Sequence, residues 1–210
     1  TGTFANGASP TTTVTGMALG ANVYRWTINN GPCPGAITTS DVSITLFNPA
    51  TAVAAAGPDQ DLCGSSSTTL AGNSVAAPAV GTWTVVSGAA TFANANAANT
   101  SITGLPIGTT VLRWTVNNGP CGTTGDNVSI SRFDPNNPVA NAGPDQSICV
   151  PVAPSIVVMA GSNVIAPAVG TWTLVSGGGT IVSPNSPTSQ ITGLPVGINE
   201  FQWTVSNGPC

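Results

Sequence analysis

An octapeptide ending in Gly-Pro-Cys occurs three times in this chain of 210 residues. It reads WTINNGPC at 26–33, WTVNNGPC at 114–121 and WTVSNGPC at 203–210, at spacings of 88 and 89 residues. A second motif, AGPDQ, occurs at 56–60 and at 142–146. Sequence similarity at a fixed period indicates a series of equivalent structural units, each packed against its neighbours.

The order of these motifs divides the chain into three units, with AGPDQ near the start of each. Residues 1–50, the first unit, correspond to the C-terminal part of one repeat. Residues 51–138, the second unit, form a complete repeat, and residues 139–210, the third unit, form a repeat that lacks its last strand. We therefore expect the chain to be a window on a longer array.

Within a unit the apolar residues recur with a period of two. In residues 111–116, Val, Arg and Thr alternate with Leu, Trp and Val, and related alternations occur at 23–28 and 200–205. This period is typical of strands with one buried face, and no segment shows helical periodicity. About seven short strands in about 88 residues predict an all-β fold class, a tandem array of immunoglobulin-like β-sandwiches.

The tryptophans occupy the inward positions of this pattern, so we expect all five to be core residues. Trp83 should meet Trp114 in the second unit, and Trp172 should meet Trp203 in the third. Trp26 should lack such a mate, because the strand that would carry it precedes the chain.

Five cysteines recur with the repeat and allow two periodic pairings. The first joins Cys63 to Cys121 and Cys149 to Cys210 within units, and gives Cys33 a partner before residue 1. The second joins successive units through Cys33–Cys63 and Cys121–Cys149. We favour the first, because the start of the first strand and the end of the sixth should lie at the same pole of a sandwich. Either pairing predicts an oxidising, extracellular compartment.

The chain carries only three basic and seven acidic residues, with no histidine and no lysine. Nucleic acid is excluded as a partner because phosphates need a basic surface. Most acid–base and zinc chemistry loses its usual residues, so we predict no enzyme, no cofactor and no metal. No apolar run reaches the roughly 18 residues of a membrane span.

Calcium is the one metal for which the chain offers candidate ligands. Asp59, Asp61 and Asp145 lie in or beside the AGPDQ turns, but calcium takes six to eight oxygens and these turns supply too few. We expect Asp59 and Asp145 instead to hydrogen-bond their own turn, as Asp commonly does.

The ordered series AGPDQxxC, GTWTxVSG, TGLPxG, RWTVxNGPC and DxVSI resembles the PKD-like, immunoglobulin-like repeats of long surface and secreted proteins of Bacteroidota. These include adhesins of the gliding-motility type and other cargo of the type IX secretion system. The resemblance spans essentially the whole chain. It implies an extracellular stalk or adhesin segment and brings no catalytic residue with it.

Repetition and resemblance together predict a non-catalytic structural segment of an extracellular bacterial adhesin, stalk or filament at the cell surface. Its expected partners are neighbouring repeats of the same chain, with self-assembly into fibres and a surface or glycan ligand as further candidates. The alternative function is a glycan-binding accessory module of a secreted enzyme. An outward aromatic patch would favour that alternative, and the pattern places no tryptophan outward.

Overall fold

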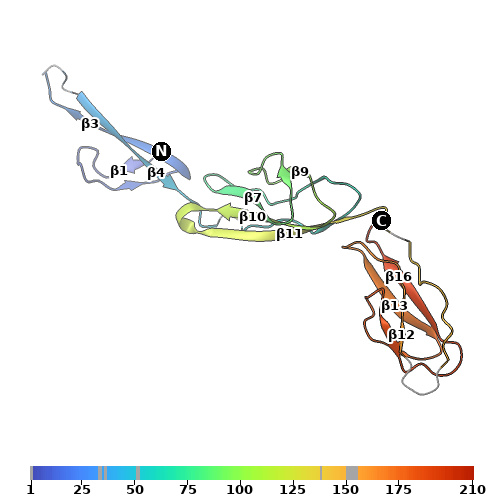
Figure 1. Cartoon of the computed structure of the whole chain (residues 1–210). Coiled ribbons are helices and arrows are strands. Elements are labelled where there is room, and N and C mark those ends of the chain that lie inside the picture. The colour runs from blue at the N-terminus through green and yellow to red at the C-terminus, as the bar shows by residue number, and fades with distance from the viewer. Residues whose placement is uncertain (1, 33–34, 36, 51–52, 138, 150–155) are drawn as a thin grey trace.

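The computed structural model describes residues 2–32, 35, 37–50, 53–137, 139–149 and 156–210. The three units follow one another along an elongated chain. Figure 1 also shows that the C-terminus returns to the junction between the second and third units instead of lying at the far tip.

Two sheets build the second unit, as the strand pattern predicts. One sheet has the order β5-β11-β10-β7, formed by β5 (Gln60–Cys63), β11 (Thr123–Phe133), β10 (Gly108–Asn117) and β7 (Val80–Ser87). The other has the order β6-β9-β8, formed by β6 (Thr68–Thr69), β9 (Ser101–Thr103) and β8 (Thr91–Phe92). All pairs are antiparallel except β5 with β11, which is parallel. This is an immunoglobulin-like β-sandwich whose first strand pairs with its last.

Alternation along β10 fills the space between the two sheets. Leu112, Trp114 and Val116 are buried, whereas Arg113 between them points to solvent. Equivalent alternation in β11 buries Val128 and Ile130. These strands contribute to one continuous core whose buried members are Ala54, Ala56, Leu70, Trp83, Ile102, Leu105, Leu112, Trp114, Val116, Val128 and Ile130.

The third unit repeats most of this arrangement. Its strands are β12 (Ile156–Val158), β13 (Val169–Ser176), β14 (Thr180–Ile181), β15 (Gln190–Thr192) and β16 (Glu200–Ser206), in sheets ordered β12-β15-β14 and β13-β16. Among the described residues of this unit, no strand corresponds to β11.

The first unit consists of two hairpins. The shorter pairs β1 (Thr3–Phe4) with β2 (Val14–Thr15), and the longer pairs β3 (Gly20–Asn29) with β4 (Ile37–Leu46). The β3–β4 ribbon corresponds to β10–β11. Its outer edges have no strand partner within the part of the unit that the structure describes.

Four of the five tryptophans form the predicted pairs. The ring centroids of Trp83 and Trp114 are 5.0 Å apart, and those of Trp172 and Trp203 are also 5.0 Å apart. Each of these rings is at most 4% exposed. The prediction that Trp26 is a core residue is wrong, because the residue is 37% exposed. In the described part of the first unit, only the small β1–β2 sheet packs on this ribbon, where Phe4 contacts Tyr24.

Candidate functional site

A disulfide joins the second unit to the third. It links Cys63, the last residue of β5, to Cys210, with a Cα–Cα distance of 5.1 Å. Cys63 lies opposite Phe133 in the parallel pair of β5 with β11. β11 ends at the junction between the second and third units. Because β5 runs parallel to β11, Cys63 at the end of β5 also lies at this junction, where it bonds to Cys210 of the third unit.

Both predicted intradomain bonds, Cys63–Cys121 and Cys149–Cys210, are therefore wrong. The register of β10 with β11 runs over ten residues, from the Cys63 end of the unit to the turn that carries Cys121. At about 3.3 Å per residue these two cysteines lie about 30 Å apart, whereas a disulfide needs Cα atoms within about 7 Å. The predicted bond needs Cys63 at the start of its strand, whereas Cys63 is the last residue of β5.

The alternative pairing, Cys33–Cys63 with Cys121–Cys149, is also wrong. Cys63 is bonded to Cys210, while Cys121 and Cys149 are free and exposed. Cys33, whose partner we expected before residue 1, lies outside the described residues.

Hydrogen bonds from two asparagines, Asn207 and Asn137, stabilise the junction between the second and third units near the disulfide. The Asn207 Nδ2 atom donates to the backbone oxygen of Asp134 at 2.9 Å, and its Oδ1 atom accepts from Asn137 Nδ2 at 3.2 Å. Asn137 also exchanges hydrogen bonds with the backbone of Ile165, at 2.9 Å and 3.1 Å. These bonds tie the linker after β11 to two loops of the third unit.

An aromatic ring completes this junction. The Phe133 ring lies against Gly208, where an added Cβ atom would stand 2.5 Å from the ring. Gly208 has a φ of 53°, a conformation that favours glycine. The Gly-Pro-Cys end of the octapeptide is therefore the turn that receives the preceding unit.

The junction between the first and second units repeats these contacts. Asn118 Nδ2 donates to the backbone oxygen of Asn48 at 2.8 Å, and the Phe47 ring lies against Gly119. A short 3-10 helix, Gly119–Cys121, forms the turn there. Sequence reasoning missed the role of Asn118 and its counterpart, although their recurrence beside each Gly-Pro-Cys was visible as a signal.

Acidic side chains hold the first segment of the second unit against β11. Asp126 Oδ2 accepts from the backbone N–H of Ala56 at 2.9 Å, and Asp59 Oδ1 accepts from the backbone N–H of Ser129 at 2.8 Å. The prediction that Asp59 bonds its own turn is thus corrected: it reaches the last strand. Charge-assisted bonds of this kind are stronger than neutral ones.

The candidate calcium ligands Asp59, Asp61 and Asp145 are not gathered into a site. Within the described ranges no group of three or more His, Cys, Asp or Glu side chains converges. Asp145 belongs to the third unit, one unit away from the other two.

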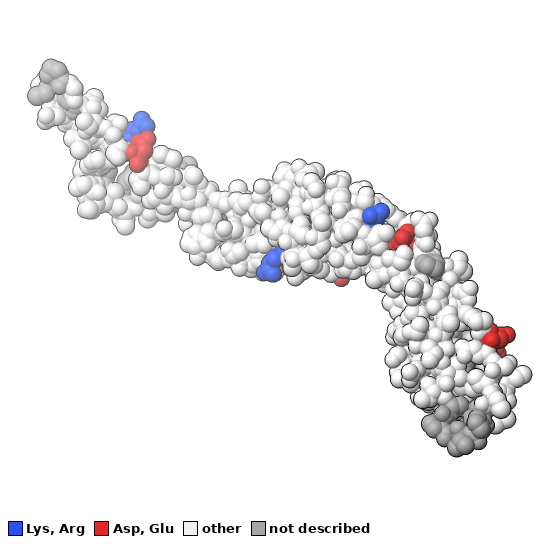
Figure 2. All heavy atoms as spheres, viewed as in Figure 1, with Lys and Arg blue, Asp and Glu red and all other residues white. Residues whose placement is uncertain are grey.

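Arginine side chains serve the scaffold in two ways. Arg132 donates from Nε to the oxygen of Gly64 at 2.9 Å and from Nη1 to the oxygen of Leu105 at 2.8 Å, which joins two loops. On the first unit, Arg25 forms a two-point pair with Asp41 at 2.7 Å and 2.8 Å. That hydrogen bond lowers the pKa of Asp41. Figure 2 shows how few charged side chains the visible surface carries.

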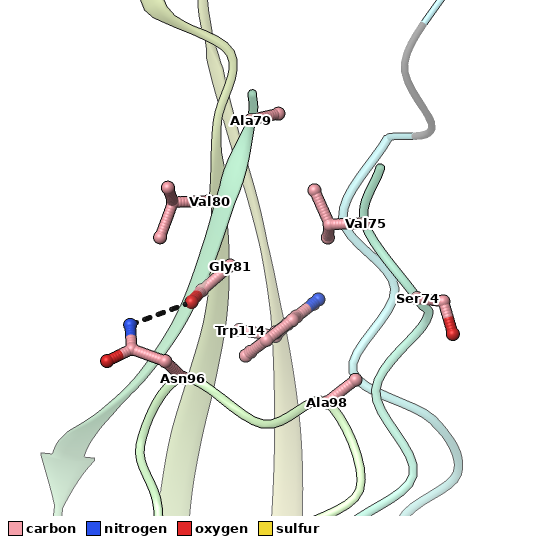
Figure 3. Close-up of a pocket in the computed structure, with 8 residues that line it drawn as sticks. All are labelled: Ser74, Val75, Ala79, Val80, Gly81, Asn96, Ala98 and Trp114. Carbon is pink, nitrogen blue, oxygen red and sulfur yellow. Dashed lines mark hydrogen bonds between the residues drawn. The ribbon is translucent and has the colours of Figure 1, made fainter. Parts of the chain in front are cut away.

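A pocket of about 340 Å³ lies beside Trp114 in the second unit. Figure 3 shows Asn96 at its edge, where Nδ2 donates to the oxygen of Gly81 at 3.0 Å. A counterpart of about 360 Å³ lies beside Trp203, with Asn185 in the place of Asn96. None of the lining residues of either pocket titrates near neutral pH, so these pockets offer no acid–base pair.

Among the described residues no helix is long and apolar enough to span a bilayer. Comparison with models of protein families finds no match, and comparison with curated proteins finds none either. Among solved structures, the chain is similar to the solution structure of the PKD domain from KIAA 1837 protein. The two are 28% identical over 42% of this chain and 92% of that one, with a TM-score of 0.35.

Proposed function

We propose that this chain is a non-catalytic structural segment of an extracellular bacterial rod, in the role of an adhesin, stalk or filament. The observation that carries the proposal is the junction, where a covalent bond and an asparagine network join successive sandwiches. The contacts of Phe47 and Asn118 at the other junction support one repeated way of joining units.

Two covalent connections join the second and third units, and this limits how far the two units can move relative to each other. The main chain crosses the junction after Phe133, and the disulfide crosses it again between Cys63 and Cys210. Two rigid bodies joined by a single linker swing freely, whereas a second covalent link removes most of those motions. A module that transmits force or holds a ligand away from a surface needs this restraint.

Composition supports the same role and its location. Structural disulfides persist in oxidising compartments such as the cell exterior. With ten charged residues among 210, the units contact one another through apolar and amide groups that salt does not screen. Low net charge also favours lateral or end-to-end association, so assembly into fibres belongs to this proposal.

Small-angle X-ray scattering of the purified chain, oxidised and reduced, tests the rod. We expect an elongated particle whose radius of gyration stays constant between low salt and 1 M salt, and whose distance distribution broadens on reduction. A variant with Cys121→Ser and Cys149→Ser serves as control, because both thiols are already free. A compact particle would contradict the proposal, and so would micromolar binding to a polysaccharide panel, which would favour the glycan-binding module.

A further inference from the structure

The turn that carries Cys121 is built like the turn that carries Cys210. In each, the cysteine N–H donates at 3.0 Å to the oxygen of an asparagine three residues earlier, Asn118 or Asn207. In each, that asparagine reaches back to the backbone of the preceding unit. The sulfur of Cys121 is therefore presented at the first junction as that of Cys210 is at the second.

The bonded cysteine lies on a strand that occupies the outer edge of β11. β5 pairs there in parallel, with Gln60 opposite Ile130 and Cys63 opposite Phe133. The sequence VSISRF that ends β11 corresponds to VSITLF at residues 42–47, which runs through the end of β4 to Phe47, the next residue. A strand at the same register along β4 would bring a cysteine opposite Phe47, beside Cys121.

That edge of β4 is open in the described part of the first unit. β4 pairs with β3 alone, and its apolar side chains are more exposed than their counterparts in β11. Val42 is 56% exposed and Ile44 is 38% exposed, whereas Val128 and Ile130, which hold the same places in β11, are 1% and 0% exposed. In the described residues, the outer edge of β4 therefore has no strand partner, and β4 has an exposed apolar face. The free thiol of Cys121 lies at the end of this edge.

We propose that the outer edge of residues 44–47, at the end of β4 and one residue beyond it, together with Cys121, binds the first strand of another repeat unit and forms a disulfide with it. The ligand has the sequence AGPDQxxC, as at residues 142–149, and adds in parallel. This inference rests on the proposed array of repeats. In this proposal, Cys121 is the cysteine of the receiving unit, as Cys210 is in the observed bond. Cys149, which is exposed and equivalent to Cys63, is a cysteine of the kind that the added strand carries.

The carboxylate of the AGPDQ motif supplies a second anchor. In the second unit, Asp59 accepts from the backbone N–H of Ser129, the second residue of the VSI sequence. Ser43 holds that place in β4, and Asp145 holds the place of Asp59 in residues 142–149. Backbone pairing, this charge-assisted bond and the disulfide together distinguish the ligand from an arbitrary thiol peptide.

Bond formation proceeds by thiol–disulfide exchange with oxidised glutathione as the oxidant. The thiolate of Cys121 attacks one sulfur of the glutathione disulfide, forms a mixed disulfide and releases one glutathione thiolate. The thiolate of the bound strand then attacks the Cys121 sulfur and releases the second glutathione. Two protein thiols are oxidised and one glutathione disulfide is reduced to two thiols.

A synthetic peptide with the sequence of residues 142–149, blocked at both ends, tests the proposal on the full chain in a glutathione redox buffer. Trypsin cuts at Arg113 and Arg132 and releases residues 114–132, in which Cys121 is the only cysteine. Mass spectrometry without reduction then reads the peptide on Cys121 apart from that on Cys149. We expect at least tenfold more peptide on Cys121, because a bound strand has an effective concentration near the millimolar range.

Control peptides keep the test independent of protein folding. In the second unit the Gly64 N–H donates to the Phe133 oxygen, so the N–H groups of alternate residues, Leu62 among them, face β11. A peptide with Ile148→Pro, at the place of Leu62, therefore loses a backbone donor in the ladder, and one with Asp145→Asn loses the carboxylate, while both keep the cysteine. We expect the proline peptide to fall to the level of a scrambled one. Equal modification of Cys121 and Cys149, or equal reaction of the native and proline peptides, would overturn the proposal. Neither result would alter the scattering test, so the two proposals fail separately.

Discussion

Removal of the disulfide between the second and third units is the sharpest test of the junction. A double variant with Cys63→Ser and Cys210→Ser leaves no new free thiol behind. The two cysteines are 147 residues apart in sequence. In the chain-entropy account, a cross-link that closes a loop of this length stabilises the folded state by about 5 kcal/mol, counted against joint unfolding of both units.

Urea unfolding followed by tryptophan fluorescence measures this loss, because the paired indoles of both units report on their cores. We expect the midpoint to fall with little change in the slope of unfolding free energy against urea. The matched control carries Cys121→Ser and Cys149→Ser, which removes two exposed thiols and no bond, and we expect a change within about 0.5 kcal/mol.

Tryptic mapping without reduction tests the observed bond against the Cys63–Cys121 bond. The Cys63–Cys210 bond joins fragment 26–113 to fragment 133–210 and leaves fragment 114–132 free. Recovery of fragment 114–132 linked to fragment 26–113 would refute the argument from strand direction. A loss of less than about 1 kcal/mol in the double variant would refute the argument from loop length.

Three further predictions concern the second and first units. Gly81→Ala places a Cβ atom in the ring of Trp114 and should destabilise the second unit by about 1–3 kcal/mol, measured by urea unfolding. In the Arg132→Lys variant, the lysine ammonium lacks the planar guanidinium group that donates to two carbonyl oxygens. The variant should lose about 1.5–3 kcal/mol of unfolding free energy in the same assay. Asp41→Asn should remove the small stabilisation that the Arg25–Asp41 pair contributes. That stabilisation is present above the ordinary carboxyl pKa of 3.8 and is lost as the pH falls through the lower pKa of Asp41 in the folded state. It should also weaken as salt is added. Unfolding curves of the native chain and the variant that differ by the same amount at pH 7 and at pH 2 would contradict this last prediction.

Much of the fold follows from local pattern. The alternation at residues 111–116 places Leu112, Trp114 and Val116 inward, and the structure confirms this. The pairing of Trp83 with Trp114 was predictable because equivalent positions in a repeat meet equivalent neighbours. Trp26 keeps the same local pattern yet is exposed, because burial needs a second sheet that its own strand cannot provide.

The junction was far less predictable. Asn118 and Asn207 act through backbone groups of the preceding unit, and nothing in their neighbouring sequence identifies those partners. A bond to its own turn is the common case for Asp, whereas the partner of Asp59, Ser129, lies 70 residues away. Contacts of this range depend on how strands are ordered in the sheet.

The sequence by itself determined the repeat, the strand periodicity, the inward position of four of the five tryptophans and the periodic sets of cysteines. Only the tertiary structure decided which cysteines meet. The deciding feature is the parallel pairing of β5 with β11, which carries Cys63 to the end of its unit instead of holding it beside Cys121. Strand direction is a property of the assembled sheet, because the same alternating side chains fit a parallel or an antiparallel neighbour.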